Sequence, residues 1–187
     1  SNSIIHTHQE YGIFAVNSTI TAKNLVMNNC GEADLGIFKG GTYTITHSTL
    51  ANYWQMNGAM PGLGIYATNE YVNRTTTEQG ALNLNIRNTI VYGEKDNSIQ
   101  FKATTGQTFS YTFQNCLVKQ GANPGYTMDG ASLKNQDPQF EHHFTQKMNL
   151  RVKAASPAKG KGSTITLPFN DIVGNPRSNP PTIGAYQ

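Results

Sequence analysis

The sequence predicts an all-β fold, a right-handed parallel β-helix of about five coils with a C-terminal cap of strands and loops. Three observations lead to this prediction. Only 13% of the residues are charged, and Asn, Thr and Gly are abundant, a composition that disfavours long amphipathic helices. A short motif that usually begins with Asn recurs along the chain. A second, apolar motif recurs between the copies of the first.

The first motif is Asn or Ser, a variable residue and then two apolar residues. Its copies are Asn2-Ser3-Ile4-Ile5, Asn24-Leu25-Val26-Met27, Ser48-Thr49-Leu50-Ala51, Asn88-Thr89-Ile90-Val91 and Asn115-Cys116-Leu117-Val118. Strand-like alternation precedes the last four copies, at Ile20 and Ala22, Thr44 and Thr46, Leu84 and Ile86, and Tyr111 and Phe113. We expect the Asn side chains to stack as a ladder at a buried bend. This ladder is interpreted as structural, because each amide can bond both the backbone and the next Asn.

The second motif is an apolar or aromatic residue, Gly, Ile and an aromatic residue. Its copies are Tyr11-Gly12-Ile13-Phe14, Leu35-Gly36-Ile37-Phe38, Leu63-Gly64-Ile65-Tyr66 and a degenerate Asn97-Ser98-Ile99-Gln100. Neighbouring coils are expected to pair as parallel strands about 4.8 Å apart, with Ile stacked over Ile inside. A leucine-rich repeat has a similar period, but its Leu-rich consensus is absent.

The predicted organisation has two parts. Residues 1–119 form the coils, with a looped insertion at residues 52–80, and residues 120–187 form a capping segment rich in Pro and Gly. We expect this segment to pack on the last coils and close the helix end. Because Asn2 already occupies the ladder position, further coils upstream, or a partner, are expected to cover the first strand edge.

Short motifs in the last fifty residues sharpen the prediction. They are Asp137-Pro138-Gln139-Phe140, Leu150, Ser156-Pro157-Ala158, Asp171-Ile172-Val173-Gly174-Asn175-Pro176-Arg177 and Ile183-Gly184-Ala185-Tyr186. With the coils, they resemble the pectate-lyase-like right-handed β-helix superfamily and the choice-of-anchor Q segment of secreted Bacteroidetes proteins. Family tails usually end in Gly-Ala-Tyr-Glu and carry an acidic residue before Ile-Gly, whereas this chain has Gln187 and Thr182. Asp171 and Arg177 are interpreted as a structural pair.

That resemblance implies a secreted or cell-surface bacterial protein that handles polysaccharides. The formal charge of +3 comes without a basic run, which disfavours nucleic acid as a partner. No apolar stretch reaches the roughly 20 residues of a membrane span. Cys30 and Cys116 lack metal-ligand spacing and are interpreted as buried small hydrophobes.

Two loops of the third coil are candidate binding elements. The first, residues 52–62, contains Trp54, and the second, residues 67–80, contains Tyr71 and Arg74. Aromatic rings stack on sugars, and Arg bonds hydroxyl or acidic groups. The alternative is that Trp54 and Tyr71 only pack the loops onto the coil.

A second candidate surface lies one residue before each ladder position. Lys23, His47, Arg87 and Gln114 stand there, and strand alternation would turn them outward as a stacked basic stripe. Such a stripe suits an acidic polysaccharide, because several weak contacts along one polymer add. The alternative is an ordinary solvated face.

No catalytic residue or metal ligand is assigned. Lyases of this superfamily abstract a proton with Lys or Arg beside clustered carboxylates, with Ca²⁺ or another cation. Here the acidic residues fall at scattered points of the repeat, and only Glu32 and Asp34 could lie near Lys39. No cofactor is expected, apart from Ca²⁺ if the protein is a lyase.

The preferred function is therefore recognition of an extracellular polysaccharide, possibly acidic, by part of a larger β-helix protein. Two alternatives stay open. The protein could be a polysaccharide lyase or glycoside hydrolase whose catalytic coils lie upstream or use Lys39 or Arg74. It could also be a structural or adhesive stalk.

Overall fold

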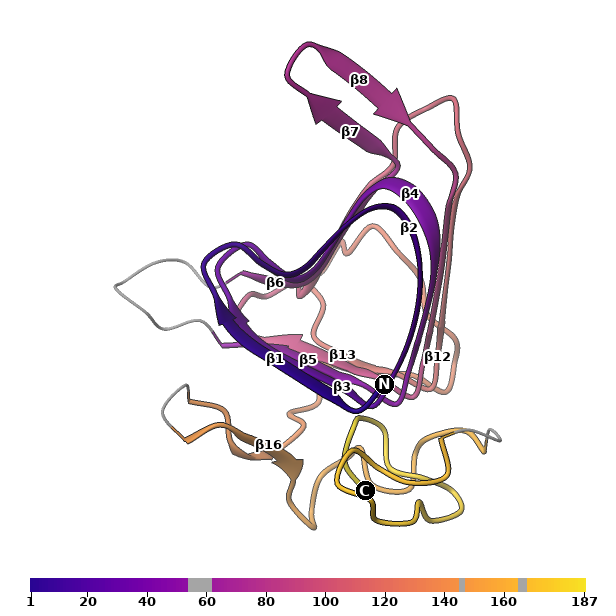
Figure 1. Cartoon of the computed structure of the whole chain (residues 1–187). Coiled ribbons are helices and arrows are strands. Elements are labelled where there is room, and N and C mark those ends of the chain that lie inside the picture. Colours follow the sequence, from indigo (N-terminus) through magenta and orange to yellow (C-terminus); the bar gives the residue numbers. More distant parts are fainter. Residues whose placement is uncertain (54–61, 145–146, 165–167) are drawn as a thin grey trace.

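Two parallel sheets wind around a common axis and give the chain a triangular outline in the view of Figure 1. The computed structural model describes residues 1–53, 62–144, 147–164 and 168–187. Within these residues the protein is an all-β parallel β-helix, as predicted. No helix in the described part of the chain is long and apolar enough to cross a bilayer.

Sheet A forms one wall of the triangle. In order across the sheet, its described strands are β1 (Ser3–His8), β3 (Leu25–Cys30), β5 (Thr49–Asn52), β10 (Ile90–Gly93), β13 (Leu117–Val118) and β14 (Leu133–Lys134). Each strand pairs in parallel with the next coil. The last strand, β14, follows the predicted coil region and adds a sixth rung to this wall.

Sheet B forms the other two walls. Its strands are β2 (Tyr11–Lys23), β4 (Ala33–Thr46), β6 (Leu63–Thr68), β9 (Leu82–Arg87), β11 (Ile99–Lys102) and β12 (Phe109–Gln114). The N-terminal part of β4 pairs with β6 and its C-terminal part with β9. We call these the first wall and the second wall. Gly40 lies between the two parts and Gly41 begins the second, with positive φ angles of 77° and 110° that glycine adopts without strain.

The ladder lies where the second wall turns into sheet A. Its members share a left-handed backbone conformation, which Asn tolerates better than most residues. They are Asn2, Asn24, His47, Asn88 and Asn115, with φ between 47° and 57°. The Asn24 amide donates to Asn2 Oδ1 over 2.9 Å, and the Asn88 Nδ2 lies 3.0 Å from His47 Nε2.

The third coil differs from the prediction by one residue. Val26 pairs with Thr49, and Thr49 pairs with Ile90, so His47 rather than Ser48 is the ladder residue. A slip of one residue exchanges the two faces of a strand. Tyr43 and Ile45 are therefore the buried inward residues here, and the prediction of Thr44 and Thr46 was wrong.

The second motif is shifted by two residues in the second coil. Leu35, rather than Ile37, pairs with Ile13 and Ile65, and Ile65 pairs with Ile99. Because side chains alternate with a period of two, this shift leaves Ile37 inward. The stack is thus Ile, Leu, Ile, Ile, and the expected stacking of like on like is nearly preserved.

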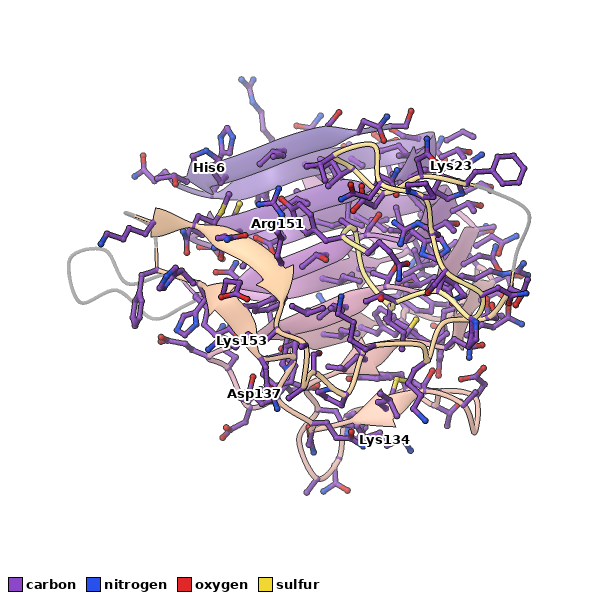
Figure 2. The ribbon with its side chains drawn as sticks, turned by 90° about the horizontal axis from the view of Figure 1, so that it is seen from below. His6, Lys23, Lys134, Asp137, Arg151 and Lys153 are labelled. Carbon is purple, nitrogen blue, oxygen red and sulfur yellow. The ribbon has the colours of Figure 1, made fainter. Side chains whose placement is uncertain are left out.

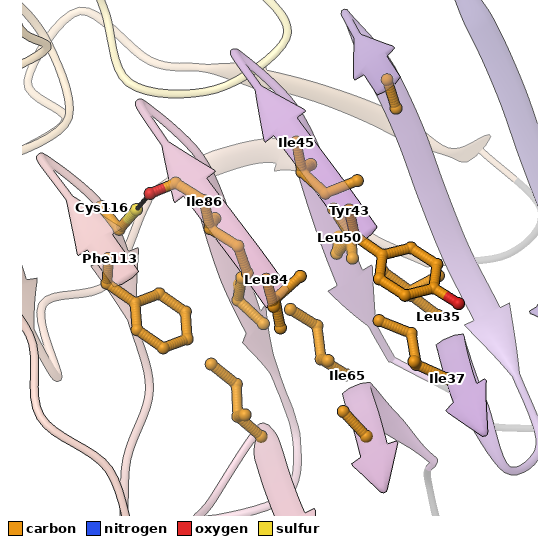
Figure 3. Packing of buried hydrophobic residues seen from close by; sticks show 14 of the residues in the cluster. Leu35, Ile37, Tyr43, Ile45, Leu50, Ile65, Leu84, Ile86, Phe113 and Cys116 are labelled. Carbon is orange, nitrogen blue, oxygen red and sulfur yellow. Dashed lines mark hydrogen bonds between the residues drawn. The ribbon is translucent and has the colours of Figure 1, made fainter. Parts of the chain in front are cut away.

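The interior of the coils holds the main hydrophobic core (Figure 3). Its largest fully buried members come from all three walls: Met27, Leu35, Ile37, Tyr43, Ile45, Leu50, Ile65, Leu82, Leu84, Ile86 and Ile99. Full burial of one such side chain stabilises a fold by roughly 1.5 to 3 kcal/mol. Cys30 and Cys116 are buried free thiols, as predicted.

The C-terminal segment covers the outer face of sheet A (Figure 1). Its first part lies against the last coil, where the Tyr126 ring packs on Phe101 and Phe113, and its later part, from about residue 137, covers sheet A. Its short strands β15 (Phe140–His142) and β16 (Asn149–Val152) pair in antiparallel fashion. A second hydrophobic core fills this interface, with Val26, Ala51, Tyr53, Ile90 and Leu117 on the coil side and Phe140, Leu150, Val152, Ala158, Ile183, Ala185 and Tyr186 on the other.

Ladder amides hold this segment along the helix axis. Asn115, Asn88 and Asn24 donate to the carbonyls of Lys161, Ser163 and Asn170, respectively, over 2.9 to 3.1 Å. The chain then returns, and Gly184 N donates to Asn88 O over 2.8 Å. A Cβ at position 184 would lie 2.9 Å from Ile90 Cδ1 and 3.0 Å from Thr49 Oγ1, which explains the glycine.

Arg177 and Asp171 both fasten this segment, although they bind different partners. Arg177 Nη2 donates to Asn24 Oδ1 over 2.8 Å and to Ala185 O over 3.2 Å. The Asp171 carboxylate accepts hydrogen bonds from the backbone of Val173, Asn175 and Gln187. Arg177 thus clamps the tail to the ladder, and Asp171 closes the turn that presents it.

Candidate functional site

Five aromatic side chains of the described residues gather on the outer face of the first wall. They are Tyr11, Phe14, Phe38, Tyr66 and Tyr71, which we call the aromatic platform. Phe14 lies 4.7 Å from Phe38 between ring centroids, and Phe38 lies 5.5 Å from both Tyr11 and Tyr66. Phe14 is 51% exposed. The rings therefore form one connected and accessible surface.

Strand alternation produces this platform. Ile13 and Ile65 point into the core, so Phe14 and Tyr66, one residue later, point outward. Between them in the register lies Gly36. A Cβ at position 36 would come within 2.5 Å of Tyr11 Cδ1. The missing side chain thus leaves space for the Tyr11 ring.

Tyr71 reaches the platform from a hairpin that projects from the coil in Figure 1. The hairpin consists of β7 (Glu70–Asn73) and β8 (Thr76–Gln79). The Tyr71 ring stands nearly edge-on to Phe14 and Phe38, at 6.3 and 6.1 Å. The predicted binding residue Tyr71 therefore forms a side wall of the platform.

Two ion pairs tie this hairpin to sheet B. Lys39 Nζ bonds Glu78 Oε2, and Lys102 Nζ lies 3.5 Å from Glu70 Oε1. Partly exposed ion pairs contribute little stability individually, roughly 0 to 1 kcal/mol. Here the two ion pairs fix the position of the hairpin, because they connect both of its strands to the sheet that carries the rings.

The platform continues into a hollow of about 350 Å³ at the first coil. His8, Gln9, Glu10, Tyr11 and Phe14 line it. Burial raises the pKa of Tyr11, and the charges of Glu32 and Glu10 and the neighbouring Tyr66 raise it further. The rim beside Tyr11 is therefore acidic.

The predicted basic stripe is interrupted. Lys23, Thr46, Arg87 and Gln114 are in register, so Thr46 occupies the position expected for His47. Arg87 is exposed, whereas Lys23 is half-buried and lines a hollow with the C-terminal segment. Lys23 and Arg87 stand two coils apart, about 10 Å, which weakens the case for a continuous cationic track.

His47 is a ladder residue that the C-terminal segment covers, with 1% exposure, so its predicted place in a solvent-exposed stripe was wrong. Burial lowers its pKa to about 3, assisted by the nearby Arg177 charge. The imidazole is thus neutral near pH 7 and cannot attract an acidic polymer. The alternating Tyr43 and Ile45 before it are the signal that could have placed it correctly.

The other predicted residues lie apart. Arg74 is exposed in the turn between β7 and β8, with a positive φ of 53°. Trp54 lies outside the described residues. Nothing therefore places either of them beside the platform.

The suggested cluster of Glu32, Asp34 and Lys39 does not form. Asp34 is fully buried, Glu32 is exposed, and Lys39 is paired with Glu78. Burial raises the Asp34 pKa well above its usual range, although the Cys30 thiol opposes the shift. A proton-abstracting Lys39 beside these two carboxylates is therefore not supported. In the described chain, no three His, Cys, Asp or Glu side chains group as metal ligands.

Comparisons with protein-family models, curated proteins and solved structures gave no match. The platform must therefore be interpreted from its own geometry. Tyr11, Phe14, Phe38 and Tyr66 all stand in the second sequence motif, yet we assigned them no binding role. For Phe14, Phe38 and Tyr66, the signal was their position directly after an inward Ile, which alternation turns outward. Alternation does not predict the outward position of Tyr11.

Proposed function

We propose that this protein binds an extracellular polysaccharide through the aromatic platform. The observation that carries the proposal is the connected set of outward rings with Phe14 half exposed. Contiguous exposed aromatic surface is unusual on soluble proteins and marks interaction sites. Aromatic rings offer an apolar face to the C–H face of a sugar, while the phenols supply hydrogen bonds.

The layout favours an extended ligand. Tyr11 and Phe14 belong to the first coil, Phe38 to the second and Tyr66 to the third. Coils succeed one another at about 4.8 Å, so the rings extend roughly 10 Å along the axis. Successive sugar units can then contact successive rings, and weak contacts on one polymer add.

The charge around the platform favours an uncharged polymer. Glu10 and Glu32 lie beside Tyr11, and Lys39 and Lys102 are paired with hairpin carboxylates. An acidic polysaccharide would meet like charge at this rim. If an acidic chain binds at all, the exposed Arg87 on the second wall is the better anchor.

We also infer kinship with the pectate-lyase-like superfamily and a secreted or cell-surface location. The stacked parallel coils and the tail motifs around Asp171 and Gly184 support this inference.

The test is a glycan array of plant, algal and animal polysaccharides, probed with the wild type, Phe14→Ala, and Val72→Ala as control. Val72 neighbours Tyr71 and is 59% exposed, so it matches Phe14 as an exposed apolar side chain. Phe14→Ala should weaken binding about tenfold, or about 1.4 kcal/mol, and Val72→Ala should leave it unchanged.

Equal binding by Phe14→Ala and the wild type would contradict the proposed role of the platform in polysaccharide binding. Ultraviolet absorbance of unsaturated uronates, recorded with the same samples, separates recognition from lyase activity. An absorbance that grows with time would show that the protein is a lyase rather than a binding protein. Absence of binding to every glycan would favour a structural stalk.

A further inference from the structure

A separate groove lies between sheet A and the C-terminal segment. It is open, has a volume of about 680 Å³ and is within the range of 300 to 1,000 Å³ typical of small-molecule sites. Its lining residues are Tyr53, Tyr92, Gly93, Glu94, Lys119, Asp137, Gln139, Phe140, His143 and Lys153. No platform ring is among them, so the two surfaces are distinct.

Aromatic rings line part of the groove. The Tyr53 ring stacks on His143 with centroids 4.2 Å apart and meets the edge of Phe140 at 6.2 Å. Tyr92 is half-buried, and Lys119 Nζ lies 5.8 Å from its ring centroid. The lining therefore brings aromatic rings together with an ammonium group.

Each wall of the groove contributes one acid and one base. Glu94 and Lys119 follow strands β10 and β13 of the coils, whereas Asp137 and Lys153, both labelled in Figure 2, belong to the C-terminal segment. The pKa of Tyr53 is raised by burial first, then by Tyr92, Asp137 and Glu94. Both carboxylates thus lie close to the aromatic lining.

Hydrogen bonds to the backbone hold the side chains of Lys119 and Asp137 in place, and one backbone bond joins Lys153 to the segment that carries Asp137. Lys119 Nζ donates to Gly93 O over 3.0 Å and to Glu94 O over 2.8 Å. Asp137 Oδ1 accepts a hydrogen bond from Gln139 N over 2.8 Å, and Lys153 N donates to Gln139 O over 2.9 Å. Polar groups that are positioned before binding lose less entropy when a ligand arrives.

We propose that this groove is a second sugar site that takes an uncharged, hydroxyl-rich residue. A hydroxyl both donates and accepts hydrogen bonds. The carboxylates of Glu94 and Asp137 can accept from such hydroxyls, while the ammonium groups of Lys119 and Lys153 donate to them. Because the four charges balance, the groove offers no net attraction to an ion.

The test uses the full chain and four disaccharides: cellobiose, xylobiose, lactose and digalacturonate. Saturation-transfer NMR detects binding, and calorimetry measures affinity. At least one uncharged disaccharide should bind at millimolar concentrations, more tightly than digalacturonate. Asp137→Asn combined with Lys153→Gln should weaken it about tenfold. Asn retains the acceptor oxygen that Gln139 N requires.

Two control variants distinguish this site from the platform. Glu141→Gln removes an exposed charge of strand β15 outside the groove, and Phe14→Ala removes a platform ring. Both should bind the disaccharide like the wild type. Failure of all uncharged disaccharides to bind, preference for digalacturonate, or loss of binding only in Phe14→Ala would each overturn the groove assignment. If Phe14→Ala shows that the platform does not bind polysaccharide, the groove can still be tested, because Asp137→Asn and Lys153→Gln change no platform residue.

Discussion

The outer faces of sheet A and of the first wall carry apolar side chains in comparable positions, yet one face is covered by the chain and the other is open to solvent. On sheet A, Val26, Ile90 and Leu117 are covered by the C-terminal segment and form a second core. On the first wall, Phe14 remains exposed and other rings are only half-buried. The covered face is mainly aliphatic and the open face is aromatic.

That contrast indicates how the two faces are used. Aliphatic side chains gain mainly by leaving water, so a face made of them is best covered by the chain itself. Aromatic rings also provide directional surfaces and, in Tyr, a polar group that suits a partly hydrated interface. An outward apolar column on a β-helix therefore needs its chemistry examined before it is assigned to packing or to binding.

The largest expected effect is on the covered face. Ile183→Ala should lower the free energy of unfolding by about 3 kcal/mol, because its fully buried side chain would leave a cavity in the second core. Phe14→Ala on the open face should cost under about 1 kcal/mol. Urea denaturation measures both. Similar losses for the two variants would remove the distinction between the faces.

The pH dependence of stability gives a second test of the covered face. His47 lies there, where the second wall meets sheet A. The unfolded chain binds a proton at this imidazole near pH 6.5, whereas the folded chain does so near pH 3. Its stabilising contribution is thus complete above pH 6.5 and declines as the pH falls toward 3. Between pH 7 and 5 the loss should be about 2 kcal/mol.

His47→Asn provides the matched variant, since Asn occupies the other ladder positions and tolerates the same backbone conformation. Urea denaturation between pH 7 and 5 should show a shallower decline of stability than in the wild type. An unchanged slope would mean that other groups carry the acid sensitivity.

A smaller effect on stability than at Ile183 or His47 is expected at Gly36, beneath the platform. Gly36→Ala places a Cβ against the Tyr11 ring, so the ring must move while the wall remains paired. We expect a stability loss of about 1 kcal/mol and weaker polysaccharide binding. Full binding in this variant would show that the position of the Tyr11 ring is unimportant.

Local repetition made most of the coil architecture predictable. Asn at the left-handed bend and alternating apolar residues identified the ladder, even though the third coil was misplaced by one residue. Ser48 was chosen because it resembles Asn chemically, but the inward Tyr43 and Ile45 fix the register at His47. Burial of a whole strand face outweighs the identity of one bend residue.

The binding surfaces were less predictable because they depend on contacts between distant parts of the chain. Tyr71 was identified from its loop, but its approach to Phe14 and Phe38 requires the hairpin to fold back. The groove joins Glu94 of the coils to Asp137 and Lys153 of the tail. No repeat in the sequence predicts where that tail lies, because its contacts with sheet A join residues that are far apart in the sequence.

The axial course of the tail also bears on how the molecule unfolds. In a solenoid each repeat contacts only its neighbours, so coils can detach one at a time from an end. Here the carbonyls of Lys161, Ser163 and Asn170 are bonded to ladder residues of the fifth, fourth and second coils. The second and fourth coils, which do not pair with each other, are thereby linked through the C-terminal segment. Fraying from the fifth coil must break these hydrogen bonds as well, so we expect that end of the array to unfold more cooperatively than a simple stack of repeats.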